Sequence, residues 1–263
     1  MSGGSPRITA RDARESGQAA IETALTLPLT MFLILGTIQL GLLLNGRLMA
    51  HYAAFRAARA GSVNQGDCSR MTEAAIAALL PSFISYMSSA TPGQTPSERY
   101  ANAFALRRKN RYDARGDSGY TEPIVWILRD RPTIAQVNAV AQNGEDVDFD
   151  QFQGDSLRME VRLIYWFPMK IPFANWVMYQ MYRTHFGLGS YTAQNPLMPT
   201  QKAAWTGSAT LRSELATELT TRGSAGHYAF PIQASYTMRM LTPAKQKFFA
   251  TQHCQPAPPI AVP

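Results

Sequence analysis

The chain has 263 residues, a formal net charge of +7 and only two cysteines. Its basic residues are scattered, and the longest basic run is the short segment 107–109. Nucleic-acid binding needs basic side chains gathered on one face with aromatic rings between them, so we expect no nucleic-acid partner. The length leaves room for one sizeable soluble domain beside a membrane segment.

An apolar run near the N-terminus dominates the sequence. Residues 23–44 carry no formal charge and would extend about 33 Å as an α-helix, enough to cross a hydrocarbon core of about 30 Å. The run is longer than the hydrophobic part of a cleavable secretory signal, and no small-residue cleavage site interrupts it. We therefore predict a single membrane span that stays on the mature protein.

The junction before this run carries a specific pattern. A polar, arginine-containing leader ends at Gly17, four uncharged residues follow, and then comes Glu22 at the mouth of the apolar run. This arrangement resembles the processing site of type IV prepilins. Residues 22–28, Glu-Thr-Ala-Leu-Thr-Leu-Pro, resemble the opening of TadE-like pseudopilins of tight-adherence pili, and residues 57–61, Ala-Ala-Arg-Ala-Gly, resemble the segment that ends their helix.

The resemblance implies a minor pilin or pseudopilin that a prepilin peptidase cuts between Gly17 and Gln18. Its first helix would insert into a tight-adherence, type IV-like pilus or its initiation or tip complex, with a role in adhesion or secretion. Glu22 would meet the new amino group of Gln18 on a neighbouring subunit, a charge pair that relieves the desolvation of both groups. The implied partners are the peptidase, other pilins or pseudopilins, the pilus assembly platform and the membrane.

The same resemblance implies a location. The protein would sit in the bacterial inner membrane as a single-pass protein with its N-terminus in the cytoplasm and its C-terminal domain exported, and would reach the cell surface in an assembled pilus. The arginines of the leader favour this orientation, although three arginines between residues 47 and 59 follow the apolar run and weaken the charge argument.

Pro28 lies inside the predicted span. It removes one helical hydrogen bond, so we expect the helix to kink or to melt locally there. Membrane helices tolerate this where a neighbouring side chain satisfies the freed carbonyl, and Thr26 and Thr30 are close enough in sequence to do so.

Beyond the helix, the sequence predicts an α+β fold. We expect a leader at 1–17, a transmembrane and stem helix at 18–61, and an exported domain at 62–263. Helical patterns cover 71–80, ended by Pro81, then 98–111, and the stretch after Trp176. Alternating apolar and polar residues predict strands at 157–163, 205–212 and 232–240, with a weaker strand at 124–128, in an antiparallel sheet with one apolar and one wet face.

Aromatic residues are concentrated between two of these strands. Trp166, Phe167, Phe173 and Trp176 suit either a membrane interface or a partner surface, and they could equally fill the core of the domain. They keep a second hypothesis open, in which an uncleaved single-pass anchor carries an exported binding or sensor domain that engages a ligand through this segment.

The two cysteines, Cys68 and Cys254, lie far apart in the chain. An exported domain meets an oxidising compartment, where a bridge closing so long a loop could contribute about 5 kcal/mol of stability. Two unpaired thiols are the alternative.

Signals for catalysis are weak. The acidic segment 145–155 lacks the glycine and the closing glutamate of a calcium loop, and the four histidines have no zinc-site spacing. The sequence carries no nucleophile elbow, phosphate loop or dinucleotide fingerprint. We expect a protein that is not an enzyme and that binds no metal or cofactor.

Overall fold

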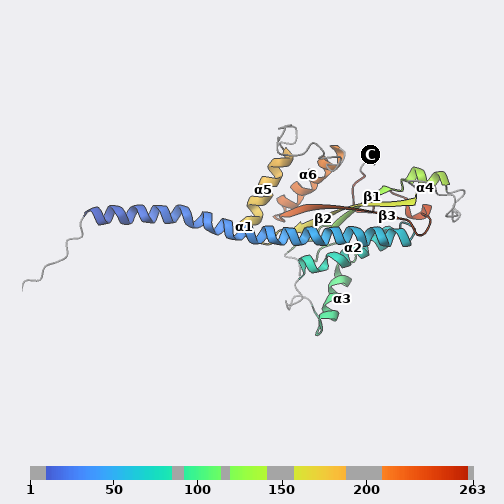
Figure 1. The fold of residues 1–263 in the computed structure, drawn as a ribbon, viewed down its shortest axis with the longest axis horizontal. Helices are drawn as coiled ribbons and strands as arrows, with labels where there is room; N and C mark the ends of the chain where they lie inside the picture. Colours follow the sequence, from blue (N-terminus) through green and yellow to red (C-terminus); the bar gives the residue numbers. More distant parts are fainter. Residues whose placement is uncertain (1–9, 85–91, 114–118, 141–156, 188–208, 260–263) are drawn as a thin grey trace, which may run out of the picture.

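One long helix organises the molecule. The computed structural model describes residues 10–84, 92–113, 119–140, 157–187 and 209–259. Helix α1 (Ala10–Val63) extends well beyond the rest of the chain at its N-terminal end, and the other elements pack on its C-terminal half (Figure 1). It begins inside the expected leader, earlier than the start near Gln18 that the sequence suggested.

The remaining elements form a body of short helices around a small sheet. The sheet has three antiparallel strands in the order β1-β2-β3, which confirms the predicted α+β class. The elements are α2 (Cys68–Phe83), α3 (Pro96–Arg107), β1 (Val125–Arg131), α4 (Ile134–Val140), β2 (Arg158–Pro168), α5 (Ala174–Gly187), α6 (Ala209–Ser224), β3 (Ala229–Arg239) and the 3-10 helix η4 (Gln246–Phe248).

The predicted strand at 205–212 is wrong, because residues from Ala209 onward belong to helix α6. Leu211, Leu215 and Leu219 are buried at a spacing of four residues, which is the period of a helix with one buried face. The three other predicted strands overlap β1, β2 and β3. A short alternating segment is compatible with both structures, and the longer repeat of leucines decides for the helix.

Helix α2 continues past Pro81, where the sequence predicted its end. Proline leaves the carbonyl four residues earlier without its usual partner, and this is the carbonyl of Ala77. The hydroxyl of Tyr100 in α3 donates a hydrogen bond to that carbonyl at 2.9 Å. A neighbouring helix thus replaces the bond that proline removes, so α2 ends at Phe83 instead.

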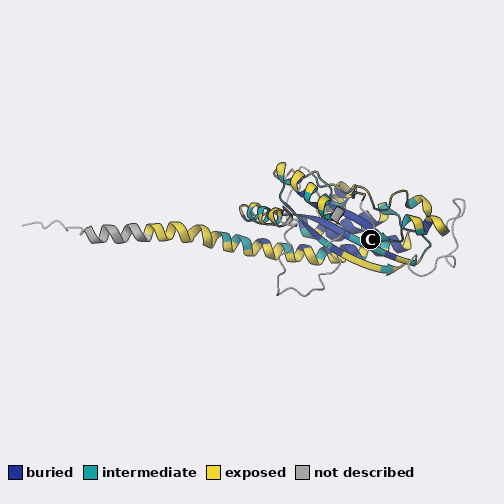
Figure 2. Ribbon diagram, turned by 90° about the horizontal axis from the view of Figure 1, so that it is seen from above, coloured by how far each residue is buried: buried dark blue, intermediate teal, exposed yellow. Residues whose placement is uncertain are grey.

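Both faces of the central strand β2 are covered over its C-terminal half. Tyr165 faces α2, where its hydroxyl lies 2.8 Å from that of Ser82, whereas its neighbour Trp166 faces α6 and carries the guanidinium of Arg222 4.4 Å above its ring. Figure 2 shows the sheet as the most buried part of the body. The expected wet face is therefore present at residues 158–162 of β2, where exposed and half-buried polar residues alternate with buried apolar ones, and it is lost from residue 163 onward, where Arg222 of α6 lies over Trp166.

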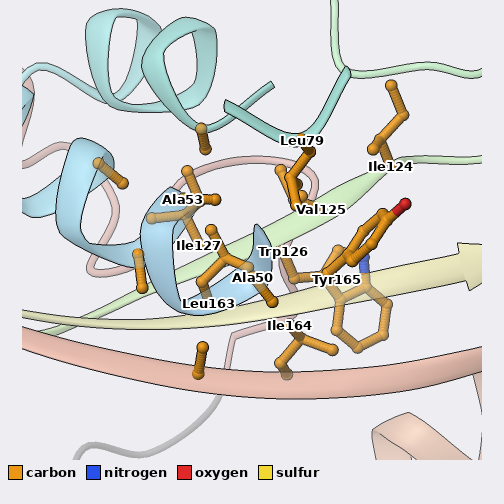
Figure 3. Packing of buried hydrophobic residues seen from close by; sticks show 14 of the residues in the cluster. Ala50, Ala53, Leu79, Ile124, Val125, Trp126, Ile127, Leu163, Ile164 and Tyr165 are labelled. Carbon is orange, nitrogen blue, oxygen red and sulfur yellow. The ribbon is translucent and has the colours of Figure 1, made fainter. Parts of the chain in front are cut away.

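The core forms where α1 and α2 meet the sheet. Figure 3 shows Ala50 and Ala53 of α1 beside Ile127, Leu163 and Leu79 from β1, β2 and α2. The buried positions of α1 between residues 50 and 58 are all alanines, namely Ala50, Ala53, Ala54, Ala57 and Ala58, each fully buried. Side chains this small let the helix backbone approach the strands closely.

Candidate membrane and assembly site

Helix α1 divides into two parts with different surroundings. Its anchor half, residues 20–44, carries exposed apolar side chains on all sides up to Met31 and on the side away from the body from Phe32 onward, and only 6% of the most apolar 18-residue window is buried. A core helix of a soluble protein would bury most of such a window. The exposed residues of the anchor half include Ile21, Leu25, Leu27, Leu29, Met31, Leu33, Ile34, Ile38, Leu40, Leu42 and Leu44.

The stem half, residues 45–63, is covered by the body. β2, β3 and α2 all pack against α1, and its alanines form part of the core. Helix α1 is thus long and apolar enough to cross a membrane while holding a folded domain at its other end. This arrangement is compatible with a single-pass membrane anchor.

The hydroxyls of Thr26 and Thr30 in the anchor half are satisfied within the helix. The Thr26 hydroxyl donates to the Glu22 carbonyl at 2.9 Å, and the Thr30 hydroxyl donates to the Thr26 carbonyl at 2.9 Å. Helix α1 continues through Pro28, so the helix does not melt there. The carbonyl that Pro28 leaves without its usual amide partner belongs to Ala24, and the two threonines bond other carbonyls.

Gln39 in the anchor half and Gly46 at the start of the stem half both contact the body, and neither was among the predicted site residues. Gln39 is fully buried, and its Oε1 accepts a hydrogen bond of 3.1 Å from the backbone N–H of Ile171. A Cβ added to Gly46 would lie 2.7 Å from a ring carbon of Phe167. Gln39 could have been singled out from the sequence, because it is a polar residue inside the apolar run. The short distance between Gly46 and Phe167 depends on the fold and has no sequence signal.

The comparison with known proteins concerns this helix. Residues 17–59 match the TadE-like protein family. The matched segment contains the anchor half, most of the stem half, and the Gly17 to Glu22 pattern. The match supports a protein associated with the Tad pilus and with the membrane. No curated protein and no solved structure matches the chain.

Within this TadE-like segment, Gly17 and Gln18 are helical residues of α1 whose side chains lie outside the described part of the chain. Cleavage between them and the charge pair of Gln18 with Glu22 therefore stay predictions. Glu22 lies at the start of the exposed apolar surface, as its place in the sequence suggested.

The aromatic segment splits into two pairs with different environments. Trp166 is fully buried and Phe167 is 3% exposed, so both belong to the core and are not a partner surface. Phe173 and Trp176, in contrast, are 53% and 48% exposed. The division follows from the end of β2 at Pro168, after which the chain turns away from the sheet.

The cysteines lie together at the far end of the stem half. Cys68 and Cys254 form a disulfide, with their Cα atoms 5.3 Å apart. It joins the start of α2 to the C-terminal segment, which also pairs with β1 through a bridge between Ile127 and Cys254.

Beside the disulfide, Arg129 is a fully buried cation that the sequence gave no reason to single out. Its guanidinium donates to the carbonyls of Gly66, Phe248, Thr251 and Gln252 and lies 4.0 Å above the ring of Phe249. Burial lowers the pKa of Arg129 to about 10. The residue ties the loop after α1 to the C-terminal segment.

In the part of the chain that the structure describes, no three His, Cys, Asp or Glu side chains gather in a way that could hold a metal ion. The acidic segment 145–155, weighed as a calcium loop, lies outside the described residues.

Proposed function

We propose that this protein is a minor pilin or pseudopilin of the tight-adherence system with a structural and not a catalytic role. The observation that carries the proposal is that the TadE-like match coincides with the part of α1 that is mostly exposed in its anchor half and packed against the body in its stem half. A pilin helix has to serve first as a membrane span and then as a packing element between subunits. An exposed apolar surface is suited to both roles.

In this proposal the peptidase cuts after Gly17 on the cytoplasmic face of the inner membrane. Glycine suits the position because a residue without Cβ leaves the backbone open to close approach. The new amino group of Gln18 then pairs with Glu22 of a neighbouring subunit. The attraction between two opposite charges offsets part of the cost of removing both from water, and an isolated charge has no such offset.

The test is the intact mass of the protein from membrane and sheared-pilus fractions of its native host. Wild-type protein is expected to begin at Gln18, or at a cyclised or methylated form of it. Glu22→Ala is expected to enter the membrane and to be cut, yet to be lost from the pilus fraction, whereas Glu22→Asp, which keeps the charge, retains part of the assembly.

Two results would contradict the proposal. Native protein that keeps residues 2–17 would favour an uncleaved anchor carrying an exported binding or sensor domain. Glu22→Ala subunits present in pili at the wild-type level would remove the charge pair from the mechanism.

A further inference from the structure

The body meets α1 inside the apolar run and not after it. The ring of Phe173 packs edge-on against Phe32, with the ring centroids 5.8 Å apart, and the backbone of Ile171 bonds Gln39. Both partners on α1 belong to the uncharged stretch 23–44. The length of α1 free of the body is therefore shorter than the length of its apolar sequence.

That free length is too short to cross a bilayer by itself. From Glu22 to Phe32 the helix advances about 15 Å, and from Gln18, the expected new N-terminus, about 21 Å, against a hydrocarbon core of about 30 Å. Sliding α1 until Phe32 reaches the outer boundary would put the inner boundary near residue 12. Glu22 would then lie near the middle of the hydrocarbon, which is costly for a carboxylate.

The alternative keeps Glu22 at the inner boundary. The outer boundary then falls about 20 residues further along α1, near residue 42. Phe32 lies about 15 Å below that level, near the bilayer midplane, and Gln39 lies about 5 Å below it, so the segment that contacts both residues lies within the outer leaflet. The part of the body found there is the loop at residues 171–173 and the helix α5 that follows it.

The surface of that part is suited to lipid. Phe173, just before α5, and Trp176, in its first turn, are 53% and 48% exposed and lie three residues apart in the sequence. Figure 1 shows α5 starting beside α1 and pointing away from it, at the edge of the body that faces the anchor half. A helix that points away from α1 in this way lies along the membrane plane when α1 crosses it.

The backbone at Phe173 is held in a conformation that bulky residues rarely adopt. Its φ is +67°, in the left-handed region. The hydrogen bond from Ile171 to Gln39 and the packing on Phe32 fix the loop on both sides of the turn. The exposed ring is thus positioned by the fold and anchored to the membrane-facing helix.

We infer that Phe173 and Trp176 form a lipid-contact surface that lies in the outer leaflet while the subunit is in the membrane. The inference rests on the membrane span of the proposed function, but not on cleavage or assembly. The body would then be a partly immersed domain whose depth α5 sets, and extraction into a pilus would have to remove α5 from lipid as well as α1.

The test uses the full chain reconstituted in phosphatidylcholine vesicles, with Trp205→Phe in every variant. Trp126 and Trp166 are buried in the body, so Trp176 supplies the emission that lipid can reach. Lipids brominated along the acyl chain are expected to quench the fluorescence, and Trp176→Phe is expected to abolish that quenching. Acrylamide, a water-soluble quencher, should reduce the fluorescence of Trp176 less in vesicles than in a sample of the protein held in amphipol without lipid or detergent.

Leu241 offers the matched control, because it is 67% exposed and its backbone bonds Ser62 near the far end of α1. In a Trp176→Phe background, Leu241→Trp is expected to be quenched by acrylamide and not by brominated lipid. Equal lipid quenching at both positions would show collapse of the body onto the vesicle and would overturn the inference.

The remaining outcomes separate this inference from the proposed function. If the protein floats with the vesicles but Trp176 is quenched only by acrylamide, the lipid contact is wrong while the anchor stands. If Trp176 becomes protected only in assembled filaments, the surface belongs to a neighbouring subunit and the lipid contact is again wrong. If the protein does not float with the vesicles, both the anchor and the inference fail.

Discussion

The anchor half and the stem half of α1 form one helix, yet other described elements cover mainly the stem half. Gly36 and Gly41 in the anchor half have nothing within 4 Å of an added Cβ, whereas Gly46 at the start of the stem half touches Phe167 and Ile232. The anchor half presents leucine and isoleucine outward, and the stem half presents alanine inward. The two halves therefore differ in side-chain size and not in helix propensity. Large apolar side chains occupy the half that is expected to contact lipid or other subunits, and alanines occupy the half that packs against the body.

The largest expected effect comes from removing the buried guanidinium of Arg129 at the end of the stem half. Arg129→Met removes the donor from the carbonyls of Gly66 and three C-terminal residues, and we expect a loss of about 3 kcal/mol or more in the free energy of unfolding. Denaturant unfolding of the body in detergent, followed by tryptophan fluorescence, measures this loss. Membrane insertion through the anchor half is expected to stay unchanged.

Arg131 on the same strand supplies the control. Its side chain is 35% exposed and lies 3.8 Å from Glu160, so Arg131→Met should cost less than about 1 kcal/mol. Equal losses from the two variants would mean that the buried contacts of Arg129 are not what stabilises this end of the molecule.

The second-largest expected effect compares the anchor half with the stem half directly, through one glycine substitution in each. Gly46→Leu places a side chain where a Cβ alone would lie 2.7 Å from Phe167 and 3.1 Å from Ile232, both in the core, and overpacking of this kind costs about 1–3 kcal/mol. Gly41→Leu meets open space and gains helix propensity, so the body should keep its stability. Thermal unfolding of both variants in the same detergent decides between them, and destabilisation by Gly41→Leu alone would reverse the assignment of the two halves.

The smallest expected effect concerns a titrating pair in the body, far along the chain from the anchor half. His227 Nδ1 lies 2.7 Å from Glu122 Oε1. Burial alone would raise the pKa of Glu122, but the hydrogen bond to His227 and bonds to the backbone outweigh it and hold the pKa below its ordinary value. A carboxyl with a lowered folded pKa contributes stability above its unfolded pKa, and this contribution is lost as pH falls through the folded pKa.

Wild type should therefore be more stable than Glu122→Gln at neutral pH, and the difference should shrink as pH falls below about 4. Thermal unfolding of both proteins between pH 7 and pH 3 gives this difference. A difference that stays constant across the range would show that the pair contributes no pH-dependent stability.

Much of α1 was predictable from the sequence, because an uncharged apolar run and the Gly17 to Glu22 pattern are local signals. Strands β2 and β3 were also predictable in part, since their alternation extends over many residues. The strand assigned at 205–212 failed because a brief alternation fits a helix as well, and the leucine repeat that marks α6 needs a longer window.

The parts that sequence could not supply depend on contacts between distant segments. Tyr100 lets α2 pass Pro81 by supplying a hydroxyl from another helix. Whether an aromatic is core or surface depended on where β2 ends, so Trp166 and Trp176 look alike in sequence and differ in the fold. Gln39 acquires its role only when the loop after β2 returns to α1.

The direction of the strands has a mechanical consequence. Figure 1 shows β2 and β3 running along the stem half of α1, so the body grips the helix over a long parallel contact. A force along α1 therefore loads the interface between the helix and the strands in shear. In shear, many contacts must break together, whereas in peeling they break one after another. The disulfide between Cys68 and Cys254 ties the C-terminal segment to the start of α2, so that segment cannot be drawn away from α2 while the bond is intact.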